Sequence, residues 1–255
     1  MKDMFYNSYQ NNNQEGGYKK SGMRVKIVIP NSSIKFRDSQ VEERKKAASP
    51  GNEVEVVCLS HGPVSIESAY DEALAAPYII EEVKKAEKEG YDAVSLDCAM
   101  DTVVRACREA LTIPVTSAGE ASYLLALGLC RKFSVVTVLK STADEIKENI
   151  NKYGFANRVA SVRFANIPVL DLKDEEKAFK AILAEAKVAI ENDGAEGIVL
   201  GCTGMSSLAK ELQQELGVPV IDPAVASLKL AEIYVTMGLR TSKIAYEVPL
   251  EKEIL

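Results

Sequence analysis

Short runs of apolar and β-branched residues alternate with longer amphipathic stretches from Arg24 onward. Several of the short runs are almost continuously apolar, which is typical of strands that are covered on both faces. The stretch from Glu176 to Ile190 instead repeats its apolar residues at helical spacing. This alternation predicts an α/β fold with doubly wound, parallel sheets. The predicted strands are Val25–Ile29, Glu53–Cys58, Ala93–Leu96, Phe133–Val138, Ala160–Phe164, Gly197–Leu200, Val218–Ile221 and Lys243–Tyr246.

An internal repeat divides this pattern into two similar halves. The segment Gly90–Cys98 aligns with Gly194–Cys202 at an offset of 104, with matching glycine, acidic, apolar and cysteine positions. A helical stretch follows each cysteine, and the match resumes later at an offset of 105. The repeat predicts two pseudo-symmetric lobes with the active site between them, lobe 1 being residues 23–115 plus 221–255 and lobe 2 residues 116–220. Each lobe presents one cysteine at the carboxyl end of a strand.

Composition narrows the class of protein. Residues 1–22 are polar and rich in Asn, Gln and Gly, which predicts a disordered tail outside the fold. The net charge of −6 without a basic stripe argues against nucleic acid or an anionic membrane as the main partner. No apolar run approaches a membrane span, and the N-terminal segment lacks the apolar core of a signal peptide.

The cysteines indicate free thiols. The chain has five of them, widely spaced and without a C-x-x-C pair, and its one histidine is His61. We therefore expect a cytoplasmic protein without disulfides and without a metal site. A capping or polar loop role is the simplest expectation for His61. The acidic cluster from Asp171 to Glu176 is expected to open the helix that follows it, with Asp174 as the cap.

Cys98 and Cys202 suit acid–base chemistry at their predicted places. Ligands of open parallel sheets bind beyond the carboxyl ends of the strands. There, the start of a following helix is expected to lower the pKa of a thiol towards neutrality. Two thiols from facing lobes can remove a proton from one face of a carbon atom and return one to the other face. Such a pair holds one proton in total and titrates as a unit.

A plainer interpretation is that both cysteines are small core residues in similar turns, since free cysteine is often buried. The other three cysteines have no such partners, and packing is their default role. No nucleotide-binding fingerprint is present, and Gly201-Cys-Thr-Gly204 alone is a weak phosphate-loop candidate.

Several motifs together resemble the Asp/Glu/hydantoin racemase superfamily, and its hydantoin racemase branch in particular. Ile27-Val-Ile-Pro-Asn-Ser-Ser33 is similar to that branch's first-strand motif, and the segment Gly62–Ala75 to its Gly-Pro-x-Ser-Ile-Glu segment. Phe133–Thr137 and Leu200–Met205 complete the resemblance, which runs from about residue 24 to 226.

The resemblance implies two catalytic cysteines, which fall on Cys98 and Cys202, and no cofactor. It also implies a small-molecule substrate and a homo-oligomer, a dimer or larger. The substrate-binding residues that it implies are Asn31, Ser32, Ser117, Thr142, Thr203 and Gly204.

Departures from the family bear on the substrate. Glutamate and aspartate racemases typically have Cys-Asn-Thr and Cys-Thr-His, where this chain has Cys98-Ala-Met and Cys202-Thr-Gly. The Asp-Pro-Gly of the hydantoin branch is here Asp101-Thr-Val. Loss of the amide and imidazole favours a less charged ring, such as a 5-substituted hydantoin. An aspartate- or glutamate-type racemase, a cysteine-dependent isomerase or decarboxylase, and a catalytically silent sensor remain alternatives.

Overall fold

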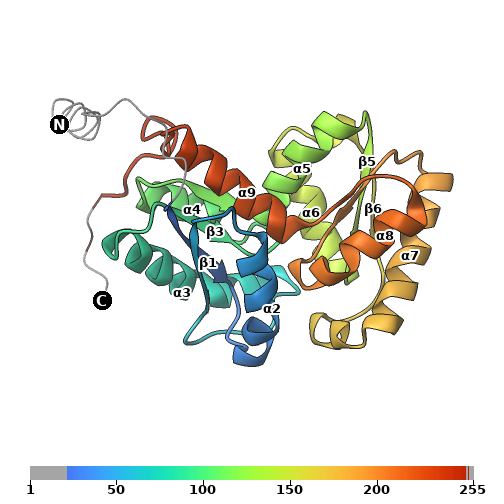
Figure 1. Cartoon of the computed structure of the whole chain (residues 1–255), viewed down its shortest axis with the longest axis horizontal. Coiled ribbons are helices and arrows are strands. Elements are labelled where there is room, and N and C mark those ends of the chain that lie inside the picture. The colour runs from blue at the N-terminus through green and yellow to red at the C-terminus, as the bar shows by residue number, and fades with distance from the viewer. Residues whose placement is uncertain (1–21, 251, 253–255) are drawn as a thin grey trace.

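Two parallel sheets of four strands form the framework of the protein (Figure 1). The computed structural model describes residues 22–250 and 252. Residues 1–21, which make up nearly all of the predicted tail, lie outside this range. The first sheet has the order β2-β1-β3-β4, with β1 (Arg24–Ile29), β2 (Glu53–Cys58), β3 (Ala93–Leu96) and β4 (Val115–Ser117). The second has the order β6-β5-β7-β8, with β5 (Phe133–Thr137), β6 (Val159–Phe164), β7 (Ile198–Leu200) and β8 (Val220–Ile221).

The helices connect these strands in the alternation that the sequence predicts. The α-helices are α2 (Ile34–Ala47), α3 (Ala69–Lys88), α4 (Val104–Ala110), α5 (Ala118–Leu129), α6 (Lys140–Lys152), α7 (Glu175–Glu191), α8 (Ala209–Leu216) and α9 (Pro223–Thr236). Short 3-10 helices are η1 (Ala156–Arg158), η2 (Val169–Lys173) and η3 (Thr203–Leu208). Asp174 caps α7 by accepting a hydrogen bond from the Lys177 amide, as the acidic cluster predicts.

The two sheets have the same topology and equivalent registers. In the first sheet Val28 pairs with Leu96, and in the second Val136 pairs with Leu200. Cys98 and Cys202 each follow two residues after the second member of these pairs. The repeat in the sequence is therefore a repeat in space, and the predicted α/β fold with two parallel sheets is confirmed.

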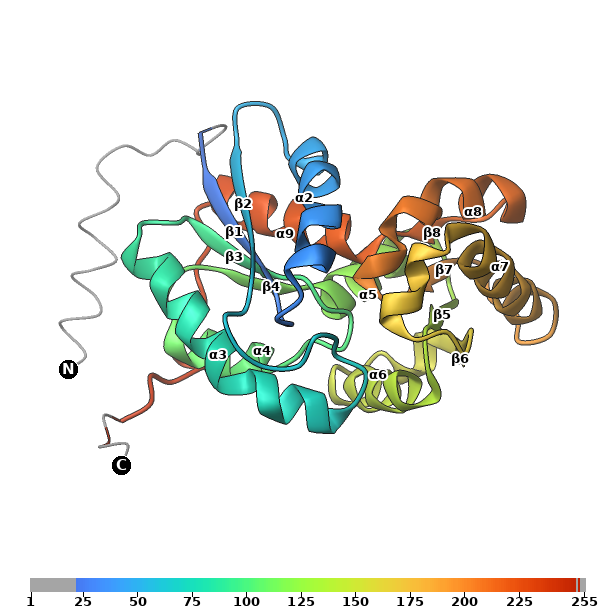
Figure 2. The same ribbon diagram turned by 90° about the horizontal axis from the view of Figure 1, so that it is seen from below.

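Helix α5 joins the two lobes through one continuous apolar core. Tyr123 and Ala126 of α5 belong to the same buried cluster as Val94 of the first sheet and Phe133 of the second. The rings of Tyr123 and Phe133 are stacked with their centroids 5.8 Å apart. Helix α9 lies against β3, β4 and α5, so the chain returns to the first lobe after β8 (Figure 2). The lobe boundaries given above stay a prediction.

One predicted strand is absent from the structure, and one observed strand was not predicted. Lys243–Tyr246 is a turn rather than a strand, because the Tyr246 amide donates to the carbonyl of Ser242 within its own segment. Lys243 instead places its ammonium on the carbonyls of Arg108 and Glu109, at the end of α4. The fourth strand of the first sheet is β4, whose three residues are too few to show an alternating pattern. No helix within the described residues is long and apolar enough to cross a bilayer.

Candidate active site

Cys98 and Cys202 line one small cavity between the two lobes. The cavity has a volume of about 30 Å³, and both cysteines are half-buried. Its other walls come from the loops that follow β3, β5 and β7, from η2 and from the segment before α3. The residues that line it are Ile66, Cys98, Ala99, Met100, Val138, Thr142, Val169, Gly201, Cys202 and Thr203. The structure therefore brings together the two thiols that lie 104 residues apart in the sequence.

The residue before Cys98 is Asp97 and the residue before Cys202 is Gly201, and each has different neighbours. Gly201 lies against Thr137, and a Cβ atom at this position would come within 2.5 Å of the Thr137 Cβ. Only glycine lets β7 end this close to β5. The equivalent residue in the first lobe is Asp97, which is buried. Its carboxylate accepts a hydrogen bond from Arg44 over 3.0 Å.

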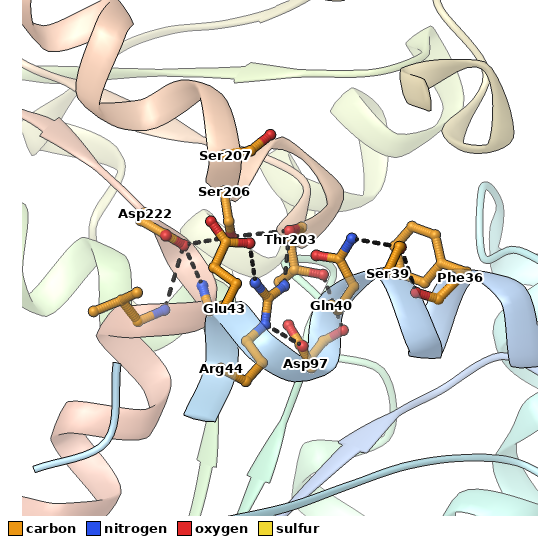
Figure 3. Close-up of polar contacts among 12 residues, drawn as sticks. Phe36, Ser39, Gln40, Glu43, Arg44, Asp97, Thr203, Ser206, Ser207 and Asp222 are labelled. Atoms are coloured by element: carbon orange, nitrogen blue, oxygen red, sulfur yellow. Dashed lines mark hydrogen bonds and ion pairs between the residues drawn. The ribbon is translucent and has the colours of Figure 1, made fainter. Parts of the chain in front are cut away.

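Arg44 connects the two cysteine-bearing loops (Figure 3). It comes from α2, its side chain is fully buried, and its Nε donates to Asp97, the residue before Cys98. Its Nη2 donates over 2.9 Å to the carbonyl of Thr203, the residue after Cys202. Burial alone would lower the pKa of the guanidinium, but Asp97 and the other carboxylates hold it above its usual value. Arg44 thus fixes the distance between the two strand ends.

The polar cluster around Arg44 continues into the second lobe. Thr203 donates its hydroxyl to the carbonyl of Asp97, which adds a second link between the lobes. Ser206 donates to Asp222, and Asp222 also caps α9 by accepting the Ala224 amide. Asp97 Oδ1 has no hydrogen-bond partner among the described residues.

The segment before α3 crosses from the first lobe to the second, over the cavity. Ile66 contributes its side chain to the cavity wall. Next to it, Glu67 accepts the Val169 amide over 2.6 Å with its carboxylate and the Ser141 hydroxyl over 2.6 Å with its carbonyl. This segment forms one wall of the cavity and belongs to the motif Gly62–Ala75 that the sequence singles out.

The loop after Cys98 has an unusual conformation. Asp101 and Val103 have φ values of 55° and 49°, in the left-handed region that β-branched residues disfavour. The carboxylate of buried Asp101 accepts hydrogen bonds from the amides of Gly119 and Glu120 and from the Ser117 hydroxyl. Asp101 thus caps the N-terminus of α5, although it lies in a different segment of the chain. Burial raises the pKa of Asp101 to about 6, although these donors act in the opposite direction.

One hydroxyl group lies between the Cys98 sulfur and a carboxyl group. Thr102 Oγ1 is 3.6 Å from the Cys98 sulfur and 2.7 Å from Glu72 Oε1. Thr102 is buried, and Glu72 comes from the first turn of α3. Burial raises the pKa of Glu72 to about 7, and the negative charges of Glu145 and Asp101 act in the same direction.

The thiols themselves have raised pKa values. Burial, followed by the charge of Glu72, raises the pKa of Cys98 well above its usual value. Burial raises the pKa of Cys202 to about 12, although the Gly204 amide donates to its sulfur. The expectation that helix ends lower these pKa values is therefore wrong. Helix α4 begins only at Val104, and a single amide beside Cys202 does not offset the loss of water.

Of the predicted binding residues, Thr142 and Thr203 line the cavity, and Gly204 lies behind Cys202. Asn31 accepts the Ser33 amide, and Ser32 donates to the carbonyls of Gly62 and Pro63. Ser117 donates to Asp101, and neither it nor Asn31 or Ser32 lines the cavity. Their binding role stays a prediction. His61 is exposed and stacks on Tyr78.

Sequence reasoning missed Arg44, Asp97, Glu72 and Thr102. Arg44 lies in the charged run Glu42-Glu-Arg-Lys-Lys46, which looks like a solvent-facing helix surface. Asp97 carried a usable signal, because a charged residue directly after an apolar strand needs a partner when it is buried. Among the described residues, no group of three or more His, Cys, Asp or Glu side chains is arranged to hold a metal ion.

Comparisons with known proteins identify relatives of this chain. The chain is 41% identical over 233 residues to a hydantoin racemase from Pseudomonas sp. (strain NS671), covering 91% of this chain and 94% of that protein. It is 37% identical over 236 residues to a hydantoin racemase from Paenarthrobacter aurescens, covering 91% and 100% of the two chains. Allantoin racemase from Klebsiella pneumoniae has a similar structure, with a TM-score of 0.88 and 34% identity over 91% of this chain and 96% of that chain.

The profile of the Asp/Glu/Hydantoin racemase family matches residues 25–231, which include both cysteines and every wall of the cavity. The chain therefore belongs to the Asp/Glu/hydantoin racemase family of enzymes.

Proposed function

We propose that this enzyme inverts a carbon stereocentre held between Cys98 and Cys202, without a cofactor. The observation that carries the proposal is the position of the two thiols, which reach one cavity from equivalent strand ends of duplicated lobes. One sulfur, as thiolate, takes the proton from one face of the carbon. The other, as thiol, gives a proton to the opposite face, and exchanging the protonation states runs the reverse reaction.

The electrostatics of the site ensure that a thiol is present to act as the acid. Both pKa values are raised, chiefly by burial, and the charge of Cys202 acts on Cys98 in the same direction. Both sulfurs are therefore protonated at neutral pH in the substrate-free site, and repulsion keeps the second sulfur protonated once the first is a thiolate. The protonated sulfur supplies the acid, and the reaction needs the other sulfur to lose its proton and act as the base.

The cavity walls favour an uncharged substrate. Ile66, Met100, Val138 and Val169 are apolar, and none of the residues that line the cavity carries a charged side chain. A free aspartate or glutamate would lose its solvation here without gaining ionic partners. A 5-substituted hydantoin is a neutral ring whose C5 proton is acidified by the neighbouring carbonyl. Allantoin, after which one of the structural relatives is named, is itself a 5-substituted hydantoin.

The cavity must widen to hold such a ring. A volume of about 30 Å³ holds one or two water molecules, whereas a hydantoin ring is several times larger. We propose that the segment around Ile66 and Glu67 moves to admit the substrate and then restores the apolar wall. The homo-oligomer and the cytoplasmic location stay predictions.

The test is exchange of the substrate's α-proton in D₂O, together with optical rotation, on single enantiomers of 5-substituted hydantoins, allantoin, aspartate and glutamate. We expect exchange and racemisation of the hydantoins. Cys98→Ala and Cys202→Ala should each lower the rate of racemisation by roughly 100-fold or more, because each removes a proton-transfer group. Cys58→Ala, a partly buried thiol outside the cavity, is the matched control and should keep the wild-type rate.

Other outcomes point to the alternatives. Turnover of a free amino acid with no action on any hydantoin would indicate an amino-acid racemase instead of a hydantoin racemase. Full activity of either cysteine variant would indicate single-cysteine isomerase or decarboxylase chemistry. Ligand binding without any proton exchange would indicate a sensor.

A further inference from the structure

Cys98 is in contact with a carboxyl group through one hydroxyl. Thr102 Oγ1 lies 2.7 Å from Glu72 Oε1 and 3.6 Å from the Cys98 sulfur, and Thr102 is buried. Each sulfur accepts a backbone amide, that of Met100 at Cys98 and that of Gly204 at Cys202, but Cys202 has no such hydroxyl and carboxyl behind it among the described residues. The two thiols of the proposed pair therefore have different means of exchanging a proton.

The single hydroxyl proton of Thr102 makes this contact directional. When Glu72 is ionised, Thr102 donates to the carboxylate and its oxygen is free to accept the Cys98 S–H. When Glu72 is protonated, its O–H donates to Thr102, and the Thr102 O–H donates to the sulfur. The second arrangement stabilises a Cys98 thiolate, because a charged acceptor gains most from a hydrogen bond.

We propose that Glu72 and Thr102 form a proton relay that generates the Cys98 thiolate. In the step, the S–H bond of Cys98 breaks and its proton moves to Thr102 Oγ1. The O–H bond of Thr102 breaks at the same time, and that proton moves to Glu72 Oε1. The products are a thiolate, an intact threonine hydroxyl and a neutral carboxylic acid. This inference rests on the proposed function, because it assigns Glu72 a role in supplying one of the two catalytic states.

The relay reduces the cost of ionising a buried thiol. Burial and the charge of Glu72 hold the pKa of Cys98 far above neutrality, so release of its proton to solvent is unfavourable. Transfer to Glu72 leaves the total charge unchanged and removes the repulsion between carboxylate and thiolate. The pKa of Glu72, about 7, suits a group that exchanges its proton at neutral pH.

Burial is the largest cause of this raised pKa, and groups that face Glu72 from other elements modify it. Glu145 and Lys152 act on it from α6, across the lobe boundary, and Asp101 acts from the loop after Cys98. The two carboxylates raise the pKa of Glu72, and Lys152 lowers it, while the Thr102 hydrogen bond also lowers it. The two lobes thus both contribute to the titration of this group.

The first experiment is the pH profile of kcat/KM for racemisation. Wild-type enzyme should gain activity as pH rises through about 7, where Glu72 becomes able to accept a proton. Glu72→Gln and Thr102→Val should each lower kcat/KM by roughly 100-fold, in both directions equally because the equilibrium constant of a racemisation is one. Thr102→Ser keeps the hydroxyl and should restore most of the activity. In Glu72→Gln the rise near pH 7 should be lost.

Stability separates this role from a structural one. A carboxyl whose pKa is raised by folding costs stability once it ionises, so the folded state loses stability as pH rises from about 4.5 to 7. Glu72→Gln should therefore have a higher Tm than wild type at pH 8 while it is less active. Glu82→Gln, on the same helix and paired with Lys26, is the matched control and should keep the wild-type rate and pH profile.

The second experiment needs no substrate. The rate at which iodoacetamide labels Cys98, followed by the mass of its peptide, should show a component that rises near pH 7 in wild type and is missing in Glu72→Gln. Wild-type activity and an unchanged pH profile in Glu72→Gln would overturn the relay and leave the proposed function intact. If labelling shows the component that rises near pH 7 but the enzyme turns over no substrate, the proposed function would be overturned and the relay supported.

Discussion

The two strand ends that bear Cys98 and Cys202 have equivalent places in the fold and different surroundings. Before Cys98 stands Asp97, held by Arg44, and behind it stand Thr102 and Glu72. Before Cys202 stands Gly201, packed against Thr137, and η3 begins directly after it. Duplication of a lobe therefore repeats the backbone path without repeating the electrostatics. The comparison shows that Cys98 has a hydroxyl and a carboxyl group behind it, whereas the strand end before Cys202 packs closely against its neighbour.

The same contrast holds for the helices that follow. In the second lobe η3 starts at Thr203 and leads directly into α8. In the first lobe a loop with two left-handed residues separates Cys98 from α4, and Asp101 within it caps α5. The first end depends on side-chain partners from distant elements, so we expect substitutions of those partners to have the larger effects.

The largest effect is expected for Arg44→Met. Removal of one member of a buried ion pair leaves the Asp97 carboxylate without a partner, and this should lower the free energy of unfolding by about 3–5 kcal/mol. Urea denaturation followed by circular dichroism measures the loss. The double variant Arg44→Met/Asp97→Asn should recover part of it, because the uncompensated charge is gone. A loss below about 1 kcal/mol in the single variant would contradict the role of Arg44.

A smaller effect is expected at the second strand end, for Gly201→Ala. Its added methyl group would meet the Cβ of Thr137 at 2.5 Å, which should lower the free energy of unfolding by about 1–3 kcal/mol. Gly204→Ala is the matched comparison, since its Cβ meets only the side-chain ends of Leu172 and Phe36 at 3.0 Å or more. If both variants lose the same free energy of unfolding, the contact with Thr137 does not explain the need for glycine at position 201.

The smallest effect is expected for Ser117→Ala. This change removes one of the hydrogen bonds that Asp101 accepts, and the amides of Gly119 and Glu120 remain, so the loss should be about 1 kcal/mol. Because the lost donor favours the carboxylate, the pKa of Asp101 should rise above about 6 and the loss should be greater at pH 8 than at pH 5. The KM of this variant tests the predicted binding role of Ser117 separately, and an unchanged KM would contradict that role. A marked rise in KM would instead support the predicted binding role of Ser117.

Much of the fold could be predicted because its signals are local. Apolar runs such as Val25–Ile29 and the helical spacing within 176–190 depend on the period of a strand or a helix, and a single segment contains them. Lys243–Tyr246 has a similar run and is still a turn, because its side chains bond to the end of α4 rather than to a neighbouring strand. Strand pairing is a property of two segments, and one segment alone does not show it.

The candidate site could be predicted only in part for the same reason. The repeat located Cys98 and Cys202, since the same nine-residue pattern ends at each. Arg44 lies 53 residues from Asp97 and 159 residues from Thr203, so no local pattern indicates that its side chain is buried between them. The raised pKa values of the thiols were missed because a cysteine next to a predicted helix does not show how much water surrounds it.

The sequence by itself determined the duplicated lobes and the placement of one thiol at the end of an equivalent strand in each. Both follow from local periodicity and from comparison of the chain with itself. Only the tertiary structure decided that the thiols share one apolar cavity, that Arg44 joins their loops, and that Glu72 lies behind Cys98 alone. The physical reason is that charge interactions and solvation depend on distances through space, and folding sets those distances between residues far apart in the chain.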